Sequence, residues 1–157
     1  MVVHPRRILW PTDFSPLALH GALYARGLRE VFDAELHVLH VVPPPIPTDL
    51  AITLPIEAPV TYGGQEIEPE YRSRLAGLVG EQFGSGAAVV VDVLFGNPWS
   101  VICRYAAEHA IDLIVVGTHG RTGLPHVLIG STAERIVQHA PCPVLVIKNP
   151  ERDFVSP

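Results

Sequence analysis

The sequence predicts a three-layer α/β fold, in which helices cover both faces of a doubly wound parallel sheet. Stretches with the composition of strands alternate along the chain with stretches that have the apolar period of helices. The strand-like stretches are short and almost wholly apolar, as is typical of strands buried on both faces of a parallel sheet. In such folds the ligand lies beyond the carboxyl ends of the strands, where the strand order reverses.

The first strand is expected over Arg7–Thr12, an apolar run that contains Pro11. A helix should follow, because Ser15 is a favourable N-cap residue and Pro16 has the φ angle of a first helical position. The second strand is expected over Glu35–Val42. The buried face of the helix carries small or apolar residues every three or four positions: Ala18, Ala22, Ala25, Leu28 and Phe32.

The stretch from Pro43 to Pro69 predicts a long irregular loop, since it holds seven of the 16 prolines. A helix is expected over Glu70–Phe83 and a third strand over Ala87–Phe95. The residues expected on the inner side of that helix are Leu75, Leu78, Val79 and Phe83.

The second half of the chain continues the alternation. Asn97 and Pro98 repeat the pattern of a helix start, and a fourth, fully buried strand is expected over Asp112–Gly117. A loop over 118–129 leads to a helix that begins at Ser131, and Val144–Ile147 is the last strand. The residues expected to face inward are Val101, Ile102, Tyr105 and Ala106 on the first of these helices, and Ala133, Ile136, Val137 and Ala140 on the second.

Composition excludes several classes of protein. A length of 157 residues fits a single domain that spans residues 1–157. The longest apolar run has five residues, whereas a membrane-spanning helix needs roughly 20. The first residues lack the apolar stretch of a secretory signal, so we expect a cytoplasmic protein. The net charge is −5 and the basic residues are scattered, which argues against nucleic-acid binding. The two cysteines, Cys103 and Cys142, do not form a zinc-binding pattern.

The segment Gly117–Thr132 has the features of a phosphate site. Its glycines allow the backbone to approach an anion closely, and the free N–H groups of a helix start favour negative charge. The hydroxyl groups of Ser131 and Thr132 can donate further hydrogen bonds. A second interpretation needs no ligand, because Ser131 and Glu134 also form the pattern of a capping box. Neither a Walker A motif nor a dinucleotide-binding glycine motif occurs.

The same segment resembles the universal stress protein family. Members of that family that bind ATP carry a glycine, two residues, a second glycine, nine residues, a third glycine, and then serine or threonine. Gly117, Gly120, Gly130 and Ser131 match this pattern here. The resemblance continues in the opening Ile-Leu-Trp-Pro-Thr-Asp-Phe-Ser, in Leu-His-Val-Val of the second strand, and in the closing Ala-Pro-Cys-Pro-Val-Leu-Val-Ile.

The resemblance implies an adenine nucleotide α-hydrolase-like sheet of strand order 3-2-1-4-5, with the site between strands 1 and 4. It places Asp13 near the ribose and Val41 against the adenine. It further implies a homodimer, which would form through the edge strand Val144–Ile147. The other implied binding residues are Pro11 and Thr12 beside the base, and Gly117, Gly120, Arg121, Gly130, Ser131 and Thr132 around the phosphates.

Two functions fit these residues. The first is a nucleotide-dependent stress-response or signalling protein that binds ATP, with Mg²⁺ held mainly by the phosphates, and acts through partner contacts. The second is a slow ATPase or phosphoryl-transfer enzyme that uses Asp13 and a divalent metal. We favour the first, because the phosphate segment has no lysine and no poised general base. We assign no residue a catalytic role and none a role as a direct metal ligand.

Overall fold

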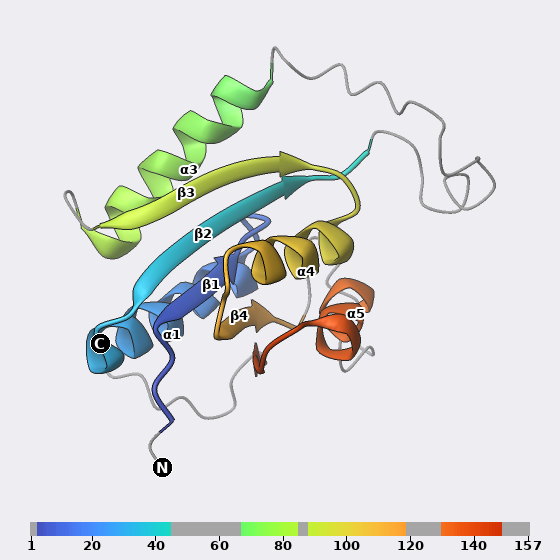
Figure 1. The fold of residues 1–157 in the computed structure, drawn as a ribbon. Helices are drawn as coiled ribbons and strands as arrows, with labels where there is room; N and C mark the ends of the chain where they lie inside the picture. The colour runs from blue at the N-terminus through green and yellow to red at the C-terminus, as the bar shows by residue number, and fades with distance from the viewer. Residues whose placement is uncertain (1–2, 45–66, 85–87, 119–129, 149–157) are drawn as a thin grey trace.

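A computed structural model describes residues 3–44, 67–84, 88–118 and 130–148. Their strands form a five-stranded, all-parallel sheet of order β3-β2-β1-β4-β5 (Figure 1). The predicted fold class and strand order are confirmed. The strands are β1 (Arg7–Pro11), β2 (Glu35–Val42), β3 (Val89–Phe95), β4 (Leu113–Gly117) and β5 (Val144–Ile147).

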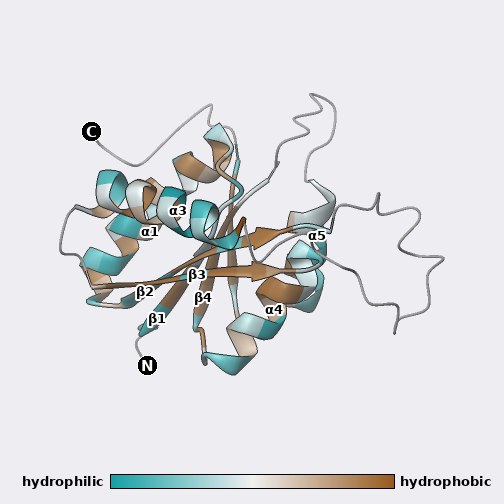
Figure 2. Cartoon of the chain, turned by 90° about the horizontal axis from the view of Figure 1, so that it is seen from above, coloured by the Kyte–Doolittle hydropathy of each residue, from teal (hydrophilic) through white to brown (hydrophobic). Residues whose placement is uncertain are grey.

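Helices cover both faces of the sheet (Figure 2). On one face, α1 (Pro16–Phe32) and α3 (Glu68–Phe83) pack over an apolar core that includes Ile8 and Val38. On the other face, α4 (Pro98–Glu108) and α5 (Ser131–His139) pack over a second core. Strand order therefore reverses between β1 and β4. Among the described residues, no helix combines the length and the apolar character that crossing a membrane requires.

Helix α1 begins as the sequence predicts. Ser15 is the N-cap residue, and its hydroxyl oxygen accepts a hydrogen bond from the Ala18 N–H at 3.2 Å. The buried indole of Trp10 donates to the Ala18 carbonyl at 3.0 Å and so ties the first turn of α1 to strand β1. A side chain added at Gly21 would lie 3.4 Å from Trp10 Nε1, which shows how closely α1 packs on the sheet.

Several predicted boundaries shift. Helix α3 begins at Glu68, and of the predicted loop Pro43–Pro69, residues 45–66 lie outside the described residues. Strand β3 begins at Val89, two residues later than expected. The prediction that Val137 is buried is wrong, since its exposed fraction is 50%. Helix α5 covers the edge of the sheet, so its buried stripe is narrow and comprises Ala133 and Ile136.

Strand β2 extends beyond β1 at the carboxyl edge of the sheet. The β1–β2 register ends at the pair Pro11↔Leu39, whereas the β2–β3 register continues to Val42↔Phe95. The main chain of β2 beyond Leu39 is thus bordered by a strand on the β3 side and by the departing β1–α1 loop on the other. This difference in length creates a notch at the reversal point of the sheet.

Candidate functional site

A pocket with a volume of ≈ 320 Å³ occupies this notch. The carboxyl ends of β1, β2 and β4 form one side of it, and the first turn of α5 forms the other. This size lies within the range of small-molecule sites, which is roughly 300 to 1,000 Å³. Its lining residues are Pro11, Thr12, Asp13, Leu39, His40, Val41, Pro43, Pro98, Ile102, Val116, Gly117, Thr118, Gly130, Ser131, Thr132, Ala133 and Ile136.

The pocket brings together most of the residues that the sequence singled out. Two predicted residues, Gly120 and Arg121, lie outside the described residues. The other predicted residues all line the pocket, although they come from four separate segments of the chain: Pro11, Thr12, Asp13, Val41, Gly117, Gly130, Ser131 and Thr132.

The β1–α1 loop fixes the position of Asp13. The Thr12 N–H donates to the Leu39 carbonyl at 2.9 Å, which extends the β1–β2 ladder by one bond. The Thr12 hydroxyl accepts from the Phe14 N–H at 3.1 Å, and Asp13 Oδ1 accepts from the Ser15 N–H at 2.9 Å. Phe14 adopts a left-handed φ of 63°, which is uncommon for a residue other than glycine. These bonds hold the Asp13 carboxylate at the start of α1, where the helix dipole favours its negative charge.

The start of α5 tests the capping-box interpretation of the phosphate segment. Gly130 is the N-cap residue, and Ser131 is the first helical residue. The capping box proposed for Ser131 and Glu134 is therefore not formed, because Ser131 is one position too late to act as the cap. The first intrahelical bond runs from the Glu134 N–H to the Gly130 carbonyl at 2.9 Å. The N–H groups of residues 131–133 have no acceptor within the helix and lie at the pocket.

Gly117 has a packing role in addition to its place in the pocket wall. A Cβ atom at this position would lie 3.2 Å from both the carbonyl oxygen and the Cγ atom of Leu17. Leu17 belongs to the first turn of α1, so the end of β4 and the start of α1 are in close contact. The glycine therefore allows the two sides of the reversal point to approach each other.

Sequence reasoning missed the apolar floor of the pocket. Leu39, Ile102, Val116 and Ile136 come from four different elements and carry no motif. Their positions near the carboxyl ends of strands, or on the helices opposite, are the signal that could have identified them. Trp99 of α4 packs against the same core cluster, and its ring contacts the His139 ring of α5, with centroids 5.0 Å apart.

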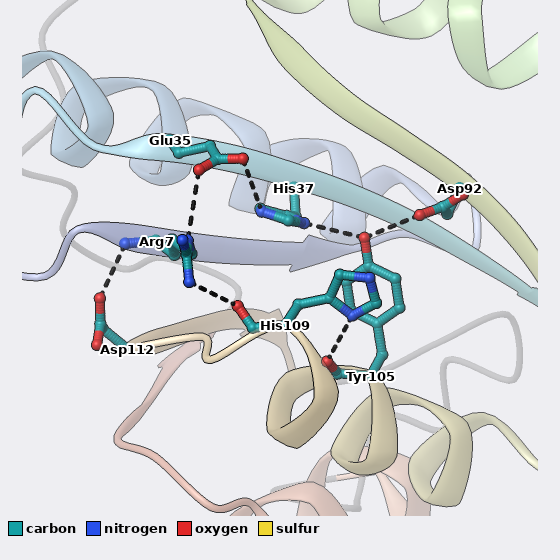
Figure 3. Close-up of polar contacts among 7 residues, drawn as sticks. All are labelled: Arg7, Glu35, His37, Asp92, Tyr105, His109 and Asp112. Atoms are coloured by element: carbon teal, nitrogen blue, oxygen red, sulfur yellow. Dashed lines mark hydrogen bonds and ion pairs between the residues drawn. The ribbon is translucent and has the colours of Figure 1, made fainter.

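A second polar cluster lies toward the amino-terminal end of β2 (Figure 3). At its centre, the Tyr105 hydroxyl donates to Asp92 Oδ2 at 2.9 Å and accepts from His37 Nδ1, also at 2.9 Å. His37 Nε2 lies 3.3 Å from Glu35 Oε1. The tyrosine and the histidine are 2% and 3% exposed. These two side chains are buried, and the hydroxyl is bonded on both sides, so the cluster joins β2, β3 and α4 and the hydroxyl is not an accessible nucleophile.

The same region fixes the starts of the strands. Asp112 Oδ2 accepts from the main-chain N–H groups of Arg6 and Arg7 at 2.8 and 2.9 Å. The Arg7 guanidinium lies 3.4 Å from Glu35 Oε2 and donates to the His109 carbonyl at 3.2 Å. These contacts connect β1, β2 and the segment before β4 at the end of the sheet away from the pocket (Figure 3).

The buried imidazole predicts how stability depends on pH. Burial lowers the pKa of His37 below its ordinary value of 6.5, and Glu35 opposes this shift. Burial prevails because the Glu35 side chain is 47% exposed, so that solvent screens its charge, and because the neighbouring His109 and Arg7 also lower the pKa of His37. The folded chain thus holds fewer protons than the unfolded chain just below pH 6.5. We expect the free energy of unfolding to rise with pH up to that value, level off above it, and be lost progressively as the pH falls.

Urea unfolding between about pH 5 and pH 8 measures this dependence. In the His37→Asn variant the amide nitrogen occupies the place of Nδ1 but does not titrate. Its free energy of unfolding should change less over the same interval than that of the wild type. An equal change in both proteins would show that His37 is not the group responsible.

Comparisons with known proteins bear on the family and the fold of this chain. The family model of the universal stress protein family matches residues 4–148. Universal stress protein MJ0531 of Methanocaldococcus jannaschii is 33% identical over 150 residues, which cover 94% of this chain and 85% of that protein. The solved structure of MJ0577, from the same organism, has a TM-score of 0.77 at 25% identity and covers 96% of this chain and 100% of that one. A universal stress protein of Archaeoglobus fulgidus in complex with dAMP has a TM-score of 0.62 at 22% identity, over 94% of this chain and 100% of that one.

Proposed function

Since the chain belongs to the universal stress protein family, we propose that it is a cytoplasmic protein that binds an adenine nucleotide, ATP above all, in the pocket between β1, β4 and α5. The observation that carries this proposal is the start of α5. Its first turn presents main-chain N–H groups that no side chain of the described residues caps, and it faces the pocket that Asp13 also lines. A helix N-terminus of this kind favours a phosphate group.

The pocket offers a suitable partner to each part of the nucleotide. The first turn of α5, with the hydroxyls of Ser131 and Thr132, would hold the phosphates, and Asp13 would lie near the ribose. The apolar floor would pack against the base. These hydroxyl and carboxylate groups are hard oxygen donors, which suits a Mg²⁺ ion bound mainly through the phosphates.

The main chain of Val41 supports adenine as the base. Parallel strands direct the N–H and C=O groups of alternate residues toward opposite neighbours. The Leu39 carbonyl bonds to Thr12 on the β1 side, and the Val42 carbonyl bonds to Gly96 on the β3 side. The N–H and C=O groups of Val41 therefore face the β1 side, where β1 has already ended and the pocket begins. The Archaeoglobus fulgidus protein, which has a similar fold, was solved in complex with dAMP, and this supports an adenine nucleotide as the proposed ligand.

We further propose that the bound nucleotide shifts the conformation around the start of α5 and thereby alters contacts with partner proteins.

We also propose that the protein forms a homodimer through the edge strand β5. Three of the four β5 residues are only partly buried, and Val137 on the adjacent helix is half exposed. Light scattering measures the dimer, and a monomeric mass would contradict it.

The alternative is a slow ATPase or phosphoryl-transfer enzyme, and the presence of Asp13 in the pocket favours it. Two measurements separate the functions. Denaturing the purified protein and identifying the released nucleotide tests binding, and calorimetric titration with ATP then gives the affinity. We expect ATP to bind and phosphate release to be slow in both the wild type and the Asp13→Ala variant. Rapid phosphate release that depends on Asp13 would establish the enzyme instead.

A further inference from the structure

His40 precedes Val41 on β2, and its side chain is enclosed between the β1–α1 loop and helix α3. The residue is 1% exposed. Its ring packs against the ring of Phe14, with centroids 4.6 Å apart, and against that of Tyr71, at 4.8 Å. The Arg74 guanidinium covers the Phe14 ring at 4.0 Å from its centroid. The imidazole is therefore held in one orientation by aromatic contacts from two elements.

In this orientation, His40 Nδ1 lies 2.7 Å from the carbonyl oxygen of Thr12. A carbonyl oxygen only accepts hydrogen bonds, so Nδ1 carries the proton and donates it. This requirement holds for the neutral ring and for the imidazolium alike. The side chain of a β2 residue thus binds the main chain of the loop that carries Asp13.

This contact replaces a bond of the β-sheet. The Thr12 N–H donates to the Leu39 carbonyl, and in a regular parallel ladder the Thr12 carbonyl would then accept from the Val41 N–H. Among the main-chain hydrogen bonds of the described loops and turns, that next bond does not occur. The His40 imidazole supplies the donor to Thr12 instead.

We propose that His40 is a positioning residue for recognition of the adenine ring. By donating to the Thr12 carbonyl, it keeps the amide of Val41 available to the pocket. This inference rests on the proposed nucleotide-binding function and adds a source of base selectivity to it. The Val41 N–H and C=O groups match an acceptor and a donor on adenine, whereas guanine carries an acceptor, O6, where adenine has its N6 amino donor.

The test compares the affinities for ATP and GTP, which share the same ribose and triphosphate. The wild type should prefer ATP. In the His40→Leu variant we expect the affinity for ATP to fall about tenfold, so that it equals the affinity for GTP. The affinity for GTP should be unchanged. The His40→Gln variant should behave in the same way, because its amide nitrogen reaches the place of Nε2 rather than Nδ1. The His40→Asn variant restores a donor at the Nδ1 place and should retain the ATP preference.

The matched control is His37→Leu, which removes another buried and hydrogen-bonded histidine from the same strand, away from the pocket. It should lower stability and leave both affinities unchanged. Circular dichroism identifies the variants that fold. If His40→Leu does not fold, the comparison of His40→Gln with His40→Asn tests the positioning role of His40.

The outcomes distinguish this inference from the proposed function. If the wild type binds neither ATP nor GTP, the proposed function itself is wrong. If the wild type binds ATP but the His40 variants keep its preference, or lose both nucleotides equally, the positioning role of His40 is wrong and the proposed function stands. Equal wild-type affinities for ATP and GTP would likewise overturn the positioning role.

Discussion

The Gly130→Val variant is expected to lose ATP binding by about 100-fold, or about 3 kcal/mol, while its fold is retained. Gly130 has φ and ψ angles of −69° and 152°, which valine also adopts, so the substitution does not strain the backbone. The valine side chain would instead be added at the pocket wall, next to the N–H groups proposed to bind phosphate. Valine is also a poor N-cap residue, so we separately expect the free energy of unfolding to fall by about 1 kcal/mol.

Calorimetric titration of ATP measures this loss, and Gly130→Ala should give an intermediate affinity. The control is Gly77→Ala on helix α3, because a Cβ atom there meets no other atom within 4 Å. Equal ATP affinity of wild type and Gly130→Val would show that the start of α5 is not the phosphate site.

The Gly117→Ala variant is expected to lower the free energy of unfolding by about 1 to 3 kcal/mol, the usual cost of overpacking. Its Cβ atom would lie 3.2 Å from the Leu17 carbonyl oxygen and 3.3 Å from the Leu17 carbonyl carbon. These are backbone atoms, so relief requires movement of the first turn of α1 rather than a change of rotamer. Because Asp13 accepts a hydrogen bond from Ser15, the N-cap residue of that helix, we also expect weaker nucleotide binding.

Urea unfolding of Gly117→Ala and of a Gly27→Ala control checks this prediction. Gly27 lies within α1, and a Cβ atom there has no neighbour within 4 Å. Alanine should therefore stabilise the helix by about 0.5 to 1 kcal/mol. If both variants are as stable as the wild type or more stable, the close approach of β4 and α1 does not require a glycine at position 117.

The sequence was sufficient to predict the fold class, because strand-like runs and helical periods alternate without ambiguity. The strand order came from the family resemblance, and it is confirmed. Helix starts were predictable where a capping residue and a proline coincide, as at Ser15 and Pro16. At the start of α5 the pattern was ambiguous, since glycine and serine are both acceptable N-cap residues and Gly130 precedes Ser131. Only the backbone geometry identifies Gly130 as the cap.

The contacts between distant segments could not be predicted. Tyr105 was expected on the buried face of its helix, but nothing local indicates that its hydroxyl bonds to Asp92 and His37. The contact from His40 to Thr12 could not be predicted either, because it depends on where β1 ends relative to β2. Such contacts are set by strand register, which has no signature in the sequence of either strand alone.

The two tryptophans provide an intrinsic fluorescence reporter for movement on one side of the sheet. Trp10 is fully buried beneath α1 and should emit a constant background. Trp99 belongs to α4 and contacts α5, with the Arg135 guanidinium 5.5 Å from its ring centroid and the His139 ring packed against it at a tilt. A displacement of α5 would change the quenching of Trp99 by these neighbours, so the emission of a Trp10→Phe variant would follow that displacement in real time without any attached dye.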